Sequence, residues 1–367
     1  MGNIKNLQKA LKDKNLDGLI ITNPVNIFYL LGFRGVSPTE REATLVVTLN
    51  TATLITARLY QQEALKLKSK DLDVKISQER REFNGFIKDV LDSSRLRSNN
   101  ILVGFEEHDL KFSEFREFKK LLKGAKFVPI KHLVEGLRII KTADEIKNIE
   151  RAQLISQKAF EQVLKTIKVG QHEAEIAENL AKIMKSLGAQ GLAFESIIAS
   201  GPNSALPHHV TGSRKIKRGE VLLFDFGAKY KDYSADLSRT VFVGRSSDQH
   251  AKIYHHVANA QQKAIAKIKS GIHASHAHKT ALAHFKKHNL EEYFLHSLGH
   301  GIGLEIHEKP SLSPKSKDML TDGMVFSVEP GLYFPPWGGV RIEDLIVIQN
   351  GKAKLLGKFA QFLEIKA

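Results

Sequence analysis

Two runs of strand-forming residues, VLLFDFGA at 221–228 and YSADLSRTVFV at 233–243, decide the fold of the second half of this chain. Both runs are rich in β-branched and aromatic residues, which predicts a pair of strands. A hairpin that turns near Tyr230 and Lys231 would place Asp225 directly opposite Asp236 on one face of the pair. The turn has no Asn-Gly signal, so the sequence leaves the register open.

A second strand pair is predicted at 324–334 and 339–349, on either side of a Pro-Pro-Trp-Gly segment. A hairpin centred near Pro336 would set Glu329 against Glu343. Inward-facing opposed carboxylates repel one another and are costly as pure structure. A cation between them makes the arrangement favourable, which indicates a metal site.

One histidine joins the four carboxylates: His300, in the glycine-rich segment HSLGHGIG at 296–303. Two divalent ions would neutralise four carboxylates in one pocket, which is typical of two-metal hydrolases. Oxygen ligands with one imidazole suit Mn, Co, Fe or Zn. A thiolate zinc site is excluded because the chain has no cysteine. The alternative interpretation is that these are ordinary surface acids and a core histidine.

The length of 367 residues predicts two domains, and the pattern divides near residue 140. Residues 1–140 alternate predicted strands and helices, which indicates an α/β domain. Residues 141–367 combine helices with antiparallel strands, which indicates an α+β domain.

Three helices are predicted in the second domain. Thr142 and Glu145 form a capping box that opens a long amphipathic helix, and Gly170 is expected to mark its end. The other two helices are expected at 172–187 and 248–269.

A net charge of +15 with a pI near 9.6 raises the hypothesis of a nucleic-acid partner. Lysines and arginines are scattered among acids, and the densest basic stretches, 66–70 and 214–218, are short. We interpret them as solvated faces and do not expect nucleic acid as a partner. The many histidines between His250 and His288 are likewise interpreted as mostly surface residues.

The chain has neither an apolar run of membrane-spanning length nor an apolar signal core at its start, MGNIKNL. The absence of cysteine suits a reducing compartment. We therefore expect a cytoplasmic protein with no membrane association.

Together these motifs resemble those of the pita-bread metallopeptidases, in particular the aminopeptidase P and prolidase (Xaa-Pro peptidase) branch. The resemblance runs from SGPNSALPH at 200–208, through the segments above, to GVRIED at 339–344. Residues 1–140 resemble, more weakly, the smaller creatinase-like domain of that family. The resemblance implies an α+β fold in which a C-terminal pita-bread catalytic domain, 141–367, follows an N-terminal α/β domain.

The resemblance also implies a dinuclear site with two divalent metal ions, manganese before cobalt, zinc or iron. Asp225 would bind one ion through both oxygens, and Asp236 and Glu343 would bridge the two ions. His300 and Glu329 would complete the other site. Glu329 would also act as the general base toward a water that bridges the ions and attacks the scissile carbonyl.

Further roles implied by the resemblance fall on residues around these ligands. His208 and His307 would steady the substrate carbonyl or the developing oxyanion. His296, Tyr333 and Arg341 would contact the substrate. The structural alternatives are histidines that satisfy backbone groups, a tyrosine packed in the core and an arginine on a solvated strand.

Two positions depart from the commonest family pattern. Ser238 stands where threonine is usual, and His209 stands where a small residue is frequent. The choice of His208 over His209 therefore rests on the Pro-His pattern alone. Trp337 and nearby aromatic residues are candidates for an apolar pocket around a proline ring.

The implied activity is that of an Xaa-Pro aminopeptidase, which hydrolyses the bond between an N-terminal residue and proline in proline-containing peptides. One alternative is an Xaa-Pro dipeptidase (prolidase). A less favoured alternative is a non-catalytic binding protein with the same fold. A homodimer is expected by resemblance.

Overall fold

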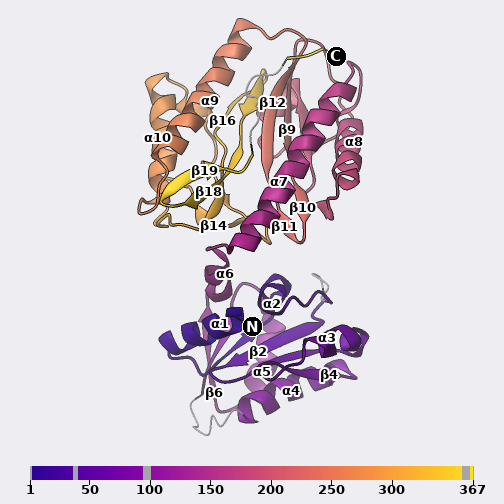
Figure 1. The fold of residues 1–367 in the computed structure, drawn as a ribbon, viewed down its shortest axis with the longest axis vertical. Coiled ribbons are helices and arrows are strands. Elements are labelled where there is room, and N and C mark those ends of the chain that lie inside the picture. The colour runs from indigo at the N-terminus through magenta and orange to yellow at the C-terminus, as the bar shows by residue number, and fades with distance from the viewer. Residues whose placement is uncertain (1, 36–39, 94–100, 358–363, 367) are drawn as a thin grey trace. The chain divides into compact units, whose positions relative to one another are not determined.

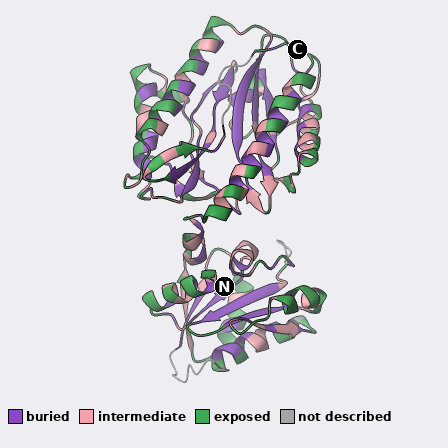
Figure 2. Cartoon of the chain, viewed as in Figure 1, coloured by how far each residue is buried: buried purple, intermediate pink, exposed green. Residues whose placement is uncertain are grey.

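The computed structural model describes residues 2–35, 40–93, 101–357 and 364–366. The chain forms two compact units, Met1–Arg138 and Ile139–Ala367 (Figure 1). In both units the strands are mostly buried, and exposed residues gather on the outer faces of the helices (Figure 2). Within the described ranges, no helix is long and apolar enough to cross a membrane.

A six-stranded mixed sheet forms the centre of the first unit, in the order β4-β3-β2-β1-β5-β6. Strands β1, β2 and β3 are antiparallel neighbours, whereas β4, β5 and β6 each pair in parallel. The strands are β1 (Gly18–Ile21), β2 (Ala43–Thr48), β3 (Ala52–Ala57), β4 (Asp73–Ser77), β5 (Ile101–Glu106) and β6 (Ala125–Ile130). The helices are α1 (Gly2–Asp13), α2 (Pro24–Leu31), α3 (Gln61–Leu67), α4 (Arg80–Ser93), α5 (Phe112–Leu121) and α6 (Leu133–Arg138).

Neighbouring residues of the central strands face two different cores, because side chains alternate across a sheet. Leu45 of β2 packs with Leu7 of α1 in one core. Val46, the next residue, packs with Ile87 of α4 in the other core. Helices therefore cover both faces of the sheet, which confirms the predicted α/β character of this part of the chain.

The second unit repeats one order of elements: two helices, then antiparallel strands. The helices are α7 (Ala143–Val163), α8 (Glu173–Ser186), α9 (Asp248–Lys267) and α10 (Ala274–Lys287). The first set of strands is β7 (Gly191–Leu192), β8 (Ile197–Ser200), β9 (Val221–Phe226), β10 (Ala228–Tyr230), β11 (Tyr233–Ser234) and β12 (Leu237–Val243). The second set is β13 (His300–Gly301), β14 (Glu308–Ser311), β15 (Val325–Val328), β16 (Gly331–Phe334), β17 (Gly338–Arg341), β18 (Asp344–Gln349) and β19 (Lys352–Leu355), and β20 (Glu364–Ile365) joins β12.

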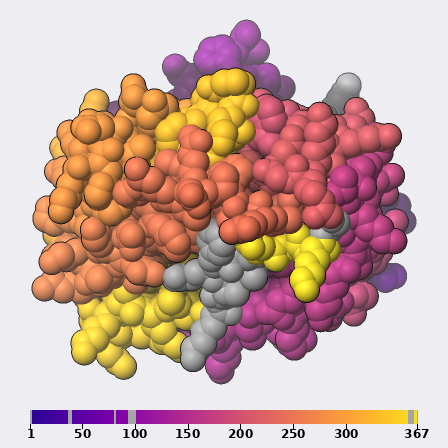
Figure 3. Space-filling model, turned by 90° about the horizontal axis from the view of Figure 1, so that it is seen from above, coloured from indigo at the N-terminus to yellow at the C-terminus, as the bar shows by residue number. Residues whose placement is uncertain are grey.

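Each pair of helices covers its own group of strands. Helices α7 and α8 share a core with β8, β9 and β12. Helices α9 and α10 share a core with β15 to β18. In Figure 3 the orange surface of α9 and α10 and the magenta surface of α7 and α8 lie on opposite sides of this unit. This α+β arrangement agrees with the predicted fold class.

The predicted helices form, with one error at a helix end. Helix α7 begins at the Thr142–Glu145 capping box, where the Thr142 backbone N–H donates to Glu145 Oε2 at 2.7 Å. It ends at Val163, so the prediction that Gly170 marks its end is wrong. A short 3₁₀ turn follows and returns Ile167 to the core, and Gly170 lies beyond it in the loop.

The first hairpin turns one residue later than predicted. Lys231 and Asp232 form the turn, and both have positive φ, 45° and 69°. A one-residue shift of the turn moves every cross-strand partner by two residues, so Asp225 pairs with Ser238 rather than with Asp236. Asp236 lies two residues before Ser238 and is the diagonal neighbour of Asp225. The Lys-Asp pair is not one of the residue pairs that favour a two-residue hairpin turn, so the sequence did not indicate the position of this turn.

The second hairpin has the predicted register. Val328 of β15 pairs with Asp344 of β18, and the β16–β17 pair continues the same register toward Pro336. Glu329 and Glu343 lie at the break between the two strand pairs, in opposing positions. The two hairpins thus contribute two acidic residues each to one region of the second unit.

Candidate metal centre

The five predicted ligands line one cavity of about 420 Å³ in the second unit. Asp225 lies on β9, and Asp236 lies between β11 and β12. His300 begins β13, Glu329 follows β15, and Glu343 precedes β18. Asp225 thus lies in a strand that pairs on both sides, whereas the other four ligands lie at strand ends or at breaks between strands.

Ligand atoms lie close together inside this cavity. His300 Nε2 is 3.6 Å from Asp236 Oδ2 and 3.4 Å from Glu329 Oε1. One ligand atom each of Asp236, His300 and Glu343 lies within 4.8 Å of the other two. Such a set is compact enough for a shared cation.

Two serine hydroxyls orient these ligands. Ser238 Oγ donates to Glu343 Oε2 at 2.9 Å. Ser327 Oγ donates to Glu329 Oε1 at 3.0 Å and accepts from the His300 backbone N–H at 3.1 Å. Outer hydrogen bonds of this kind fix the direction of ligand lone pairs. No pattern in the sequence points to this role for Ser327.

A glycine lets the His300 segment approach strand β15. A Cβ on Gly299 would lie 2.0 Å from the carbonyl oxygen of Ser327. Any side chain there would push His300 away from Glu329. Close packing at the cavity wall therefore requires glycine at position 299.

The electrostatics of the cavity are those of carboxylates in need of a cation. Burial, together with repulsion from the other carboxylates, raises the pKa of Asp236 and of Glu343 well above their ordinary values. Burial also raises the pKa of Glu329 to about 7, and burial lowers the pKa of His300, so its imidazole is neutral and free to act as a ligand.

Two carboxylate oxygens of the cavity are unsatisfied in a way that a metal ion would relieve. Asp236 Oδ1 and Glu343 Oε1 are buried and have no hydrogen-bond partner among the described residues. A buried, unsatisfied carboxylate oxygen is costly unless a cation binds it. The donors are oxygens with one imidazole, a set that suits Mn, Co, Fe and Zn.

Hydrogen bonds of Arg341 connect the predicted ligand Asp225 with Tyr333, which in turn contacts His296. Its Nη2 donates to Asp225 Oδ2 at 2.5 Å, and its Nε donates to Ser238 Oγ at 2.8 Å. Its Nη1 donates to the Tyr333 hydroxyl at 2.8 Å, and that hydroxyl lies 2.8 Å from His296 Nε2. Arg341 and His296 line the cavity, whereas Tyr333 is buried behind them and is not a lining residue.

The two neighbouring histidines at 208 and 209 have different surroundings. His208 lines the cavity. His209 instead points to Glu173, with Nε2 at 3.0 Å from Oε2. Glu173 has a fully buried side chain and also accepts from the Ser200 N–H and Oγ at 2.7 Å and from Asn203 Nδ2. Glu173 therefore anchors the segment that leads to His208, a role with no signal in the sequence.

Part of the remaining cavity wall is apolar. Phe194, Ile197, Pro207 and Ile306 line it beside His307, whose ring centroid is 4.3 Å from that of His300. Trp337 is not among the lining residues, because its ring packs on His250 and Phe334, at centroid distances of 4.9 and 5.6 Å. The suggestion that Trp337 supplies a proline pocket is therefore wrong.

The interpretation of the histidines at 250–288 as mostly surface residues holds for five of the eight and is wrong for three. His250, His278 and His284 are buried. Helices α9 and α10 pack on each other and on the sheet, so one face of each helix is covered. The sequence pattern concealed this because histidine is compatible with either a buried or an exposed face.

Comparison with protein families decides the relationship. The model of metallopeptidase family M24 matches residues 147–350, and the model of the creatinase/prolidase N-terminal domain matches residues 3–140. The chain belongs to metallopeptidase family M24. The resemblance inferred from the sequence is thereby confirmed, as is the fold of a creatinase-like N-terminal domain followed by a pita-bread domain.

Relatives of this M24 protein cover nearly its whole length. An Xaa-Pro dipeptidase from Pyrococcus furiosus is 37% identical over 355 residues, which are 97% of each chain. Among solved structures, an Xaa-Pro dipeptidase from Bacillus anthracis has a TM-score of 0.93 at 34% identity, over 100% of this chain and 99% of that chain. An X-Pro aminopeptidase from Thermotoga maritima has a TM-score of 0.86 at 31% identity, over 96% of this chain and 98% of that chain.

Proposed function

We propose that this M24 metallopeptidase hydrolyses the bond between an N-terminal residue and proline, with Xaa-Pro dipeptides as its preferred substrates. The observation that carries the proposal is the cavity in which four carboxylates and one imidazole converge, with two buried carboxylate oxygens unsatisfied. The dipeptidase names among full-length relatives favour dipeptides over longer peptides.

In this proposal the five ligands hold two divalent ions, with manganese as the first choice. Asp236 and Glu343 would be shared between the ions, because both side chains are buried and one oxygen of each has no hydrogen-bond partner among the described residues. Asp225 belongs to one ion, and His300 and Glu329 belong to the other. Bound divalent ions would supply Lewis-acid chemistry, lowering the pKa of water and polarising the scissile carbonyl.

Glu329 acts as the general base in this scheme. Its side chain is partly buried and reaches the cavity, and Ser327 fixes one of its oxygens. A carboxylate with a pKa raised toward neutrality can accept a proton from water and return it to the leaving nitrogen. The return step matters here because the prolyl nitrogen must be protonated to leave.

The histidines hold the substrate in place. His208 and His307 both line the cavity, and burial lowers the pKa of His307, so a neutral imidazole donates a hydrogen bond to the carbonyl oxygen. His296 and Arg341 bound the same space, and Tyr333 keeps both in position through its hydroxyl.

The apolar wall accounts for a preference for proline. The bond before proline has no N–H to donate, so a peptidase that depends on extended backbone pairing loses one contact there. A flat ring can regain that loss by packing on apolar side chains. Phe194, Ile197 and Ile306 provide such a surface beside the proposed ligands.

The same proposal includes domains at 1–140 and 141–367, a homodimer and a cytoplasmic location. A second candidate, release of the first residue from longer Xaa-Pro-Xaa peptides, is favoured by the likeness to the Thermotoga maritima X-Pro aminopeptidase.

The test compares kcat/KM for Ala-Pro with kcat/KM for Ala-Pro-Ala, using enzyme loaded with manganese. Faster dipeptide cleavage supports the dipeptidase, and faster tripeptide cleavage supports the second candidate. If neither peptide is cleaved while both metal sites are filled, the proline-directed proposal is wrong.

A further inference from the structure

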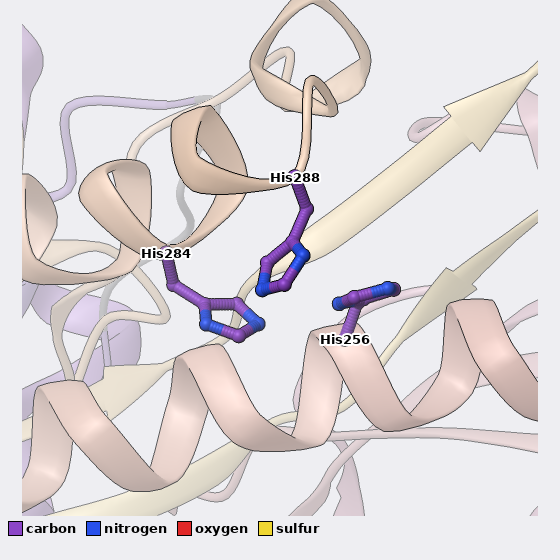
Figure 4. Close-up of side chains that lie close together, drawn as sticks. All are labelled: His256, His284 and His288. Atoms are coloured by element: carbon purple, nitrogen blue, oxygen red, sulfur yellow. The ribbon is translucent and has the colours of Figure 1, made fainter.

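Three histidines lie together where α9 packs against α10, and none of them lines the catalytic cavity. His256 comes from α9, His284 comes from the last turn of α10, and His288 caps the C-terminus of α10. Figure 4 shows the three rings turned toward a common point, each with a nitrogen facing it. One ring nitrogen of each histidine lies within 4.8 Å of the other two.

The geometry points to a second metal site, in which His256, His284 and His288 bind a divalent transition-metal ion that prefers imidazole, such as zinc, copper or nickel. His284 and His288 are four residues apart, so they project from the same face of the end of α10. Three imidazoles with one open position are a known zinc ligand set. The absence of carboxylates from this set separates it chemically from the oxygen-rich catalytic site.

The cluster leaves two buried ring nitrogens unsatisfied. His256 Nδ1 and His284 Nε2 are buried, and no described residue forms a hydrogen bond with either. Burial, with help from neighbouring positive charges, lowers the pKa of His284 to about 4 and lowers the pKa of His256. A metal ion bound between the rings would give these buried nitrogens the partner that they lack.

A small closure would complete the coordination. Tetrahedral zinc with Zn–N bonds of about 2.05 Å requires nitrogens about 3.3 Å apart, compared with the separations of up to 4.8 Å found here. His288 is exposed and lies at the end of its helix, so its ring can turn inward. The same exposure gives the ion a path from solvent, and water can take the fourth position.

Lys263 opposes the ion and tunes its affinity. Lys263 Nζ lies 2.9 Å from His284 Nδ1 and donates to it, which leaves the ring proton on Nε2. Metal binding at Nε2 needs the opposite tautomer, so Lys263 must turn away. Its side chain is exposed and can do so. Lys252 and Lys287 add positive charge nearby, so we expect binding weaker than in closed structural zinc sites.

A bound ion would join α9 to α10 outside the catalytic cavity. The two helices form part of the core beneath the second hairpin, which carries Glu329 and Glu343. The ion would cross-link the two helices. We therefore expect it to raise the stability of the folded protein and to leave peptide cleavage unchanged.

The test is equilibrium dialysis of the manganese-loaded enzyme against Zn²⁺ at neutral pH, with bound zinc counted per chain. Wild type is compared with His284→Gln and His288→Gln, and His276→Gln, an exposed histidine of the same helix, is the matched control. We expect one zinc fewer in the first two variants and the wild-type count in the control. Zinc that replaces manganese in the cavity affects all four proteins equally and cancels in the difference.

Equal zinc counts in all four proteins would overturn the proposal. His288 is exposed, so its substitution leaves the fold intact even where His284→Gln destabilises it. The proposal further predicts that Zn²⁺ raises the Tm of wild type and of His276→Gln by about 2–4 °C but not that of His288→Gln. Lys263→Met should tighten zinc binding roughly tenfold, and weaker binding in that variant would contradict the geometry. Peptide cleavage by all these variants should match wild type.

Discussion

Removal of metal ions should make the second unit less stable as pH rises from 5 to 8. Burial raises the pKa of Glu329 from 4.5 to about 7 in the absence of ions. Between these two values the folded state holds a proton that the unfolded state has released, so stability is greatest below the unfolded pKa and falls as pH rises through the folded pKa. A shift of this size corresponds to about 3 kcal/mol of unfolding free energy.

The buried partners of Glu329 act in the same direction. The pKa values of Asp236 and Glu343 are also raised, first by burial and then by neighbouring carboxylates. Their titration therefore adds to the loss of stability as pH rises. Bound divalent ions neutralise these groups, so the metal-loaded protein should show little of this pH dependence.

Urea unfolding at pH 5 and pH 8, with chelator or with Mn²⁺, measures the effect. Trp337 is the only tryptophan of the chain and packs on His250 and Phe334, so its fluorescence reports on the second unit. Glu329→Gln is the control, because it removes the titrating group and should reduce the pH slope of the metal-free protein. Equal stability of the metal-free wild type at both pH values would refute the reasoning.

Three further substitutions test separate parts of the site. Glu329→Gln should lower kcat for Xaa-Pro cleavage by about 10²–10⁴-fold because the general base is lost, and unchanged kcat would remove Glu329 from that role. Ser238→Ala should weaken metal binding by about 10–100-fold, since the hydroxyl orients Glu343. Competition with a chelator for the metal ion measures this affinity, and Ser238→Thr should restore it. Glu173→Ala should lower the free energy of unfolding in urea by about 3–5 kcal/mol, because the buried N–H and hydroxyl of Ser200 lose their acceptor.

The sequence predicted the acidic residues of the site better than their spatial relations. The pairing of Glu329 with Glu343 followed from a hairpin centred on Pro336, and the register agrees. The pairing of Asp225 with Asp236 failed because Lys231 and Asp232 form the turn with left-handed backbone conformations. Lysine adopts that conformation rarely, so local propensity did not place Lys231 in the turn.

The roles of residues that act through tertiary contacts could not be predicted from the sequence. Glu173 lies on a helix far from the ligands along the chain, yet it holds Ser200 and His209 in place. The histidines of α9 and α10 looked like surface residues because their cluster depends on how two helices pack. Such contacts join residues with no shared pattern in sequence, and only the fold brings them together.

The most direct test of the account is a titration of metal-stripped enzyme with Mn²⁺, in which bound metal and Ala-Pro hydrolysis are measured on the same samples. The account predicts no hydrolysis without metal and activity that rises until two ions are bound per chain at the cavity. The variant Glu343→Gln should fail to reach that stoichiometry. Full activity in the stripped enzyme, or no hydrolysis with both sites filled, would contradict the central claim.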